Sequence, residues 1–236
     1  MSILRTIIDQ SVFSLGWALR SRKIHVTSRH PTQKVCVNLG CGLAIASGWV
    51  NVAASLNALF SGSPRLFLSI LYQLSGSNRY YRQEQYIQLL KDNQFVFYDL
   101  SRGLPFYPNS VDFFYSSHFL EHLFLRNATD LLQNKFTALR SGGVARIAIP
   151  DLEHAVALYH QGKKREMLSQ YFFVDDKESF LARHKYMYDF EILSDILAKI
   201  GFINIHRCDY QQGMVPDLDQ LDNRPEETLF VEAMKP

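Results

Sequence analysis

The sequence predicts an α/β fold built on a doubly wound, mostly parallel sheet of seven strands. Short runs rich in β-branched and aromatic residues alternate along the chain with segments of helical periodicity, which is the pattern of parallel sheets. The first of these runs also ends on two glycines one residue apart. The predicted strands are 35–40, 49–53, 95–99, 111–116, 144–149, 202–208 and 228–234.

The composition is that of a single globular domain. A chain of 236 residues with 47% hydrophobic residues can bury a sizeable core. Its net charge of +2, from 25 Lys and Arg against 23 Asp and Glu, argues against a nucleic-acid partner. Cys36, Cys41 and Cys208 form no Cys-x-x-Cys pair, which fits a reducing cytosol and excludes a paired-cysteine zinc site. We therefore expect a cytoplasmic protein.

Residues 1–30 are predicted to form an amphipathic helix and a basic linker, followed by the main domain at 31–236. Apolar residues recur at helical spacing at Leu4, Ile8, Val12, Leu15 and Leu19. Asp9 interrupts any signal-peptide core, and no small-residue cleavage site follows. No stretch reaches the ~18–20 apolar residues that a membrane span needs. We expect the helix to pack on the domain or to cap a ligand cleft. Peripheral contact with a membrane surface, helped by the basic residues that follow, is the alternative.

The first predicted strand and its turn, Val-Cys-Val-Asn-Leu-Gly-Cys-Gly at 35–42, are the most informative segment. Gly40 can take the positive φ of a tight turn, and Gly42 has no Cβ to keep a ligand away from the backbone. Such turns bind nucleotide-like ligands at the ends of strands, although they also occur for structural reasons alone. Only about eight residues then separate Gly40 from Trp49, so the first crossover holds one or two helical turns at most.

Two later helices and one insertion are also predicted. The helix before the fifth strand has an apolar stripe that includes Leu132 and is ended by Ser-Gly-Gly at 141–143. A second helix covers 190–200 and stops at Gly201. Residues 54–94 form a long insertion that is expected to act as a lid or a packing arm. Its candidate helices are 66–74 and 83–91.

Five motifs occur in a fixed order along the chain. They are Asn-Leu-Gly-Cys-Gly (38–42), Gly-Trp-Val-Asn-Val (48–52), Phe-Val-Phe-Tyr-Asp-Leu (95–100), Leu-Glu-His-Leu (120–123) and Pro-Asp-Leu-Glu (150–153). This succession resembles the class I S-adenosylmethionine-dependent methyltransferases, and within them a small bacterial group of the methyltransferase type 11 kind. The resemblance covers roughly residues 34–234. It implies a Rossmann-like sheet with the last strand antiparallel, S-adenosylmethionine as cofactor, and a small-molecule, glycan or lipid-linked acceptor.

The resemblance also assigns cofactor contacts. It places the methionine part of the cofactor over the glycine turn and the adenine beside Asp99 and Leu100. The alternative for Asp99 is that it caps the turn that follows. Asn38 is expected to organise the glycine turn. The complete predicted cofactor set is Asn38, Gly40, Cys41, Gly42, Ala53, Asp99, Leu100, Ser117 and His118.

Ala53 departs from the family, which has an aspartate there to bind both ribose hydroxyls. Hydrogen bonds to a charged group contribute about 1.5–3 kcal/mol each, so their loss would weaken cofactor binding unless another residue compensates. Asn51 and Ser55 are the candidates, since side chains two residues apart share one face of a strand. The departure leaves open a second interpretation, a non-catalytic binding protein with a methyltransferase fold.

Ser117 and His118 follow the fourth strand, at the sheet edge where ligands bind. Methyl transfer to a hydroxyl needs donor and acceptor in line and a proton removed. His118 is therefore predicted as a pocket wall or base, and Glu121 and His122 as catalytic residues on the acceptor side. The alternative is that Glu121 caps a helix and His122 is structural. Some ubiquinone-pathway O-methyltransferases hold a divalent cation with a similar Leu-Glu-His segment, but no metal site is predicted here.

The same letters, 118–122, spell His-x-x-Glu-His, the inverted signature of zinc peptidases. This interpretation requires one helix that presents both histidines and a further acidic ligand, for which Glu178 and Glu191 are the candidates. Because the segment follows a strand of a sheet that other motifs explain, the peptidase is the least favoured function.

Overall fold

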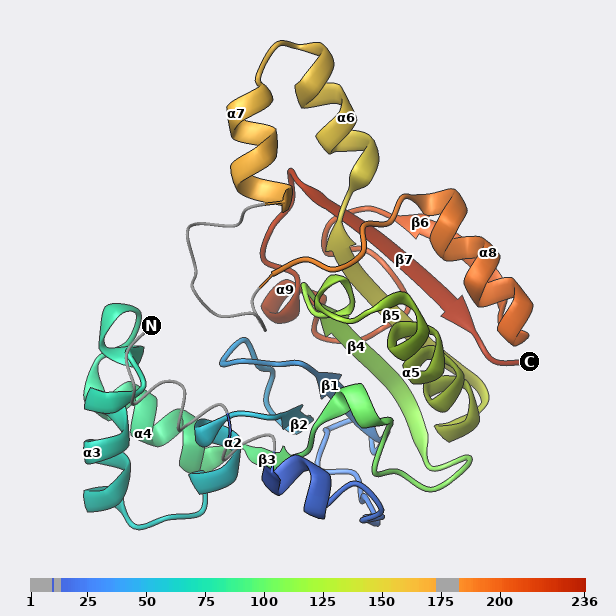
Figure 1. Cartoon of the computed structure of the whole chain (residues 1–236). Coiled ribbons are helices and arrows are strands. Elements are labelled where there is room, and N and C mark those ends of the chain that lie inside the picture. Colours follow the sequence, from blue (N-terminus) through green and yellow to red (C-terminus); the bar gives the residue numbers. More distant parts are fainter. Residues whose placement is uncertain (1–9, 11–13, 173–182) are drawn as a thin grey trace.

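The computed structural model describes residues 10, 14–172 and 183–236, and its sheet confirms the predicted fold class (Figure 1). The strands are β1 Cys36–Leu39, β2 Val50–Ala53, β3 Gln94–Phe97, β4 Val111–Ser117, β5 Leu139–Pro150, β6 Ile203–Cys208 and β7 Thr228–Met234. Their order in the sheet is β3-β2-β1-β4-β5-β7-β6. The pairings among β1 to β5 are parallel, whereas β7 is antiparallel to both of its neighbours. The prediction that the last strand is antiparallel is therefore confirmed.

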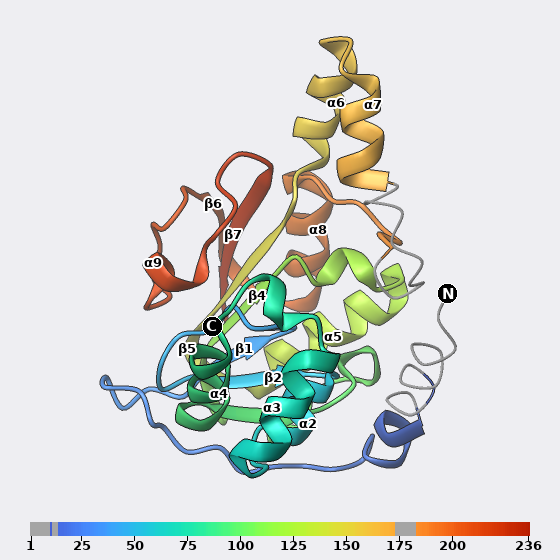
Figure 2. The ribbon, with the colours of Figure 1, turned by 90° about the vertical axis from the view of Figure 1, so that its left-hand side faces the viewer.

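Helices cover both faces of this sheet. The α-helices are α2 Leu56–Phe60, α3 Arg65–Leu74, α4 Gln83–Asp92, α5 Leu125–Ala138, α6 Leu152–His160, α7 Lys164–Met167, α8 Phe190–Ile200 and α9 Leu218–Leu221. Shorter helical turns are η1 Ser77–Arg79, η2 Leu100–Arg102, η3 Leu120–His122 and the π-helical η4 Leu168–Phe172. α5 and α8 pack on one face and α9 on the other, while α6 and α7 project beyond the sheet (Figure 2). None of these described helices combines the length and the apolar character required to cross a membrane.

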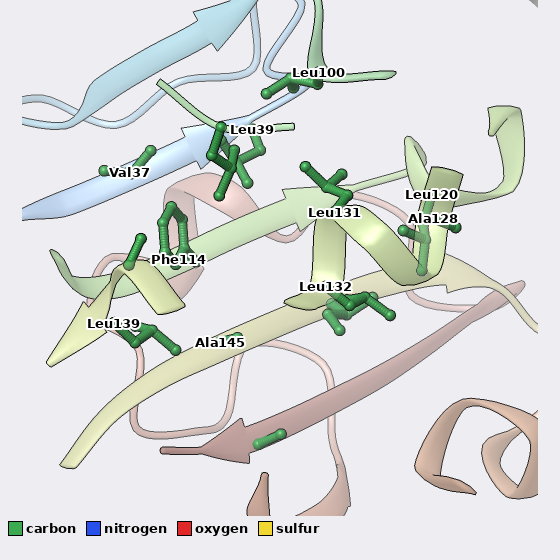
Figure 3. Close-up of a cluster of buried hydrophobic side chains, with 14 of the residues drawn as sticks. Val37, Leu39, Leu100, Phe114, Leu120, Ala128, Leu131, Leu132, Leu139 and Ala145 are labelled. Atoms are coloured by element: carbon green, nitrogen blue, oxygen red, sulfur yellow. The ribbon is translucent and has the colours of Figure 1, made fainter. Parts of the chain in front are cut away.

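The main core lies between the sheet and α5. Alternate strand residues point to one face, so Leu39 of β1 and Phe114 of β4 reach the side on which Leu131 and Leu132 of α5 pack (Figure 3). All four side chains are fully buried. This packing fixes the carboxyl ends of β1 and β4 next to each other, and the functional residues follow these two ends.

The opposite face carries a buried ionic network. Arg146 of β5 is 0% exposed, and its guanidinium lies 2.5 Å from Oδ2 of Asp222 and 3.3 Å from Oε1 of Glu232 in β7. Tyr115 of β4 donates to Asp222 as well, at 3.1 Å. Removing one partner of such a buried pair leaves an uncompensated charge, so the network firmly anchors the residues directly after Asp222.

Two predicted helix boundaries can be compared directly with the structure. α8 covers 190–200 and ends on Gly201 in the left-handed conformation, as predicted. The prediction that Ser-Gly-Gly at 141–143 ends the preceding helix is wrong, because α5 already stops at Ala138. Leu139 already pairs with Val111 in the sheet, so β5 begins before Ser-Gly-Gly and includes these three residues.

The insertion at 54–94 contains both predicted helices, as α3 and α4, together with α2, which was not predicted. Leu68 of α3 and Tyr86 of α4 lie in one buried cluster, and Leu43 of the glycine turn packs against it. The hydroxyl of Tyr81 also donates to the carbonyl of Leu43 at 3.2 Å. The insertion is thus packed on the glycine turn. The crossover at 40–49, where one or two helical turns were allowed, contains no helix.

Lys135 of α5 provides a test of this core, because its side chain is 0% exposed and its Nζ donates to Oγ of Ser116 at 2.8 Å. Burial lowers the pKa of Lys135 to about 7. Between pH 7 and about 10 the unfolded chain binds a proton there that the folded chain does not, so the free energy of unfolding rises with pH over this window.

We predict that Lys135→Met is more stable than the wild type at pH 7 and that its advantage shrinks by up to about 1.4 kcal/mol per pH unit above pH 7. Urea unfolding at a series of pH values measures the difference. Lys199→Met, at an exposed position of α8, is the control and should follow the wild type. A constant difference between Lys135→Met and the wild type would contradict the lowered pKa.

Candidate functional site

The two glycines after β1 have different physical roles. Gly40 and Gly42 both have positive φ, at 68° and 52°. A Cβ atom on Gly40 would lie 2.5 Å from Cγ of Phe119, so packing forbids any side chain there. A Cβ atom on Gly42 would meet nothing within 4 Å in the described part of the chain. Gly42 therefore faces open space, which is the property that a ligand-binding turn requires.

Asn38 holds this turn in place, as predicted. Its Nδ2 donates to the carbonyl of Ala44 at 2.8 Å and to Oδ1 of Asn51 at 3.3 Å. Asn51 in turn donates to the carbonyls of Trp49 and Gln94 at 3.1 and 3.3 Å and is fully buried. Its amide is thus committed to the sheet and is unsuited to bind a ribose.

A pocket of about 260 Å³ opens beside the turn. The glycine turn at 40–44 forms one wall, Ser117 and His118 at the end of β4 form another, and Asn223 and Arg224 close the third. The pocket lies where the chain leaves β1 in one direction and β4 in the other, the topological switch point at which ligands bind in such sheets. The buried network at Asp222 positions Asn223 and Arg224.

Six of the nine predicted cofactor residues line this pocket. They are Asn38, Gly40, Cys41, Gly42, Ser117 and His118. Asn223 and Arg224 were not predicted, because they belong to no motif and reach the pocket only through the long-range contacts that precede β7. In the sequence itself, the one local sign of a turn at these residues is the proline that follows Arg224.

Ala53, Asp99 and Leu100 are not among the residues that line the pocket. Asp99 caps η2: its Oδ1 accepts from the backbone N–H of Ser101 at 3.1 Å, and its Oδ2 accepts from Nε of Arg102 at 2.9 Å. The capping alternative thus describes Asp99 in this structure, and its adenine contact stays a prediction. Leu100 is buried in the main core.

The N-terminal segment covers the part of the expected cleft that contains Ala53 and Asp99. Leu15 and Leu19 pack against a cluster that includes Cys41, Ala53 and Phe97. Close to them, a Cβ on Gly16 would lie 2.7 Å from Cβ of Asp99. Leu4, Ile8 and Val12 of the predicted stripe lie outside the described residues. Ser55, the other candidate for the ribose, accepts from the N–H of Ala58 as the cap of α2.

His118 has a positive φ of 47° and forms the pocket wall next to Arg224. Its Nε2 lies 2.9 Å from Oγ1 of Thr228, and its Nδ1 lies 3.5 Å from Nη1 of Arg224. Burial, followed by the nearby Arg224 charge, lowers the pKa of His118 to about 3. Both ring nitrogens already have polar neighbours, and an imidazole with this pKa is a weak base at neutral pH, so the wall is favoured over the base among its two predicted roles.

Glu121 and His122 lie behind His118, outside the residues that line the pocket. The side chain of Glu121 is 1% exposed, and neither carboxyl oxygen has a hydrogen-bond partner among the described residues. Burial raises the pKa of Glu121 to about 8. Among the described residues Glu121 therefore caps no helix, which is the alternative considered for it. His184, to which the sequence assigned no role, has its Nε2 3.9 Å from Oε1 of Glu121.

The peptidase interpretation required one helix carrying both histidines. Instead, His118 precedes η3, which spans only Leu120–His122, and α5 begins later, at Leu125. Glu191 lies exposed in the first turn of α8, and Glu178 lies outside the described residues. The helix that presents both zinc ligands in such peptidases does not form here.

Comparisons with known proteins agree with the fold. No protein-family model and no curated protein sequence matches the chain. A solved structure of a possible exported protein from Bordetella parapertussis is 14% identical, with a TM-score of 0.50 over 96% of this chain and 67% of that chain. At this identity the likeness shows the fold alone.

Two further solved structures are S-adenosylmethionine-dependent methyltransferases. One, from Archaeoglobus fulgidus, is 14% identical over 97% of this chain and 94% of that chain, with a TM-score of 0.49. The other, SibL in its apo form, is 15% identical over 88% of this chain and 53% of that chain, with a TM-score of 0.49. The chain thus spans about half the length of SibL.

The two glycines can be distinguished by substitution. We predict that Gly40→Ala lowers the free energy of unfolding by about 1–3 kcal/mol more than Gly42→Ala. Both variants incur the cost of a left-handed alanine, about 1–2 kcal/mol, but only Gly40→Ala also forces a methyl group into the ring of Phe119. Urea unfolding of both variants measures this difference, and equal losses would contradict the packing at Gly40.

Proposed function

We propose that the protein is an S-adenosylmethionine-dependent methyltransferase whose glycine turn binds the methionine part of the cofactor. The observation that carries the proposal is the open space at Gly42, at the switch point of a seven-stranded sheet with an antiparallel last strand. The order of the five sequence motifs supports it. Bound at this turn, the cofactor would supply an electrophilic methyl group, and the protein would hold donor and acceptor in line.

Arg224 gives the pocket the charge that this ligand needs. Arg224 is exposed and lines the pocket beside His118, and its guanidinium carries the donors for bidentate contact with a carboxylate. The methionine part of S-adenosylmethionine ends in such a carboxylate. We therefore assign Arg224 to the cofactor carboxylate and the backbone of 40–42 to the remainder of the methionine part.

The adenosine part requires movement of the N-terminal segment. The pocket of about 260 Å³ is smaller than the ~300–1,000 Å³ of sites that enclose drug-sized ligands, so it takes only part of the cofactor. Leu15 and Leu19 cover Ala53, where the family places the ribose contact. We propose that the segment at 14–20 moves away from Ala53 when the cofactor binds.

A non-catalytic binding protein is the second candidate. The observation in its favour is that Ala53 is covered and that both substitutes considered for the ribose have other partners. On either function we propose a cytoplasmic location, and for the enzyme a small-molecule, glycan or lipid-linked acceptor. The resemblance to the type 11 bacterial group supports this acceptor class, and the N-terminal helix remains the candidate for peripheral membrane contact.

Calorimetric titration with S-adenosylmethionine tests the site. We predict that the wild type binds and that Gly42→Asn binds at least about tenfold more weakly, which corresponds to ~1.4 kcal/mol. Asparagine tolerates positive φ, so this variant keeps the turn while its side chain enters the ligand space. Gly76→Asn, at another positive-φ glycine with open surroundings, is the matched control and should bind like the wild type.

The other outcomes distinguish the two functions. Equal affinity of Gly42→Asn and the wild type would place the cofactor elsewhere and overturn the proposed site. If neither protein binds at millimolar cofactor while both are folded, the enzyme is rejected in favour of the non-catalytic binding protein.

A further inference from the structure

We propose that Glu121, His122 and His184 form a binding site for a divalent transition-metal ion, and that Zn²⁺ is the ion their chemistry fits. This inference is independent of the proposed methyl transfer. It rests on a convergence of donor atoms from two distant segments of the chain. These atoms all lie within 4.8 Å of one another.

The carboxylate of Glu121 is the first reason for the site. It is 1% exposed, and among the described residues neither oxygen accepts or donates a hydrogen bond. A buried polar group without a partner is costly, so such groups in native proteins usually serve a function or bind an ion. Carboxylates that face several imidazoles are typical metal ligands.

The two histidines present the correct atoms. Nδ1 of His122 lies 3.3 Å from the carbonyl of Arg183, and Nδ1 of His184 lies 2.7 Å from the carbonyl of Tyr171. A carbonyl accepts but cannot donate, so each Nδ1 carries a proton, and the lone pair of each neutral ring is then on Nε2, the nitrogen nearer to Glu121. Backbone carbonyls orient metal-binding histidines in this way.

The spacing of the donor atoms agrees with coordination. Nε2 of His122 and Nε2 of His184 lie 3.7 and 3.9 Å from Oε1 of Glu121. Ligands at about 2.0–2.2 Å from a tetrahedral Zn²⁺ are about 3.4 Å apart, so these two distances exceed the coordinated spacing by about half an ångström or less. The N–H of Lys185 donates to the carbonyl of Glu121 at 2.7 Å, which joins the two segments beside the metal ligands.

The site adjoins the pocket. Nδ1 of His118, which lines the pocket, also lies 3.7 Å from Oε1 of Glu121. Three protein ligands leave a fourth position on Zn²⁺ for water or for an oxygen of a second ligand. The structure thus assigns to this ion a place behind the pocket wall, where it can hold the 120–123 and 183–186 segments together.

A second group of donors, His206, Cys208 and Glu232, provides the internal control. Both carboxyl oxygens of Glu232 already accept hydrogen bonds, from Arg146 and from the N–H groups of Met214 and Val215. Since this carboxylate is already satisfied and is ion-paired with Arg146, we expect no ion there. A variant of His206 therefore tests whether any binding belongs to the proposed site.

The test uses the full chain after dialysis against EDTA, titrated with Zn²⁺ by calorimetry. One ion should bind per chain, and Glu121→Gln and His184→Gln should each weaken binding by at least about 100-fold. His206→Gln should bind like the wild type. Cobalt(II) added in place of zinc should give the visible absorption bands of a low-coordinate site in the wild type and in His206→Gln alone.

Circular dichroism in EDTA shows which variants are folded, and His122→Gln replaces any that is not. The proposal is overturned if the wild type does not bind Zn²⁺, if the ligand variants bind as the wild type does, or if binding is lost in His206→Gln. Because the titration contains no S-adenosylmethionine, its failure would leave the methyltransferase proposal intact.

Discussion

The contact between Gly40 and the ring of Phe119 is the constraint on which the rest of the site depends. It brings the turn after β1 against the segment after β4 so closely that no side chain fits between them. Gly40 also turns the main chain with a positive φ, and Gly42 follows it with open space at its Cβ position. One packing requirement thus creates the pocket.

The same contact determines what lies behind the pocket. On either side of Phe119, His118 has the left-handed conformation and lines the pocket, and Glu121 is buried in the protein interior. A buried carboxylate is costly, and Glu121 is approached by the rings of His118, His122 and His184, whose nitrogens lie 3.7–3.9 Å from its Oε1. The pocket wall at His118 and the buried carboxyl group of Glu121 therefore belong to one short segment, residues 118–121.

The sequence was sufficient for the sheet because strand periodicity, helix stops and turn glycines are local signals. Gly40, Gly42 and His118 were predictable for the same reason. Arg224 and His184 were not, since each reaches the site from a segment more than 60 residues away from its partner, and no local pattern records that approach. For Asp99 the local pattern allowed two roles, because a carboxylate after a strand can contact a ligand or cap the next turn. In the structure its hydrogen bonds with Ser101 and Arg102 are those of a cap.

Hydrogen–deuterium exchange of the full chain, with and without S-adenosylhomocysteine, tests the central claim most directly, namely that the glycine turn binds the cofactor while the N-terminal segment covers the remainder of its site. We expect slower exchange at 40–44, where the backbone amides would contact the ligand, and faster exchange at 14–20, where Leu15 and Leu19 would leave Ala53. Unchanged exchange at 40–44 in the presence of saturating ligand would contradict it.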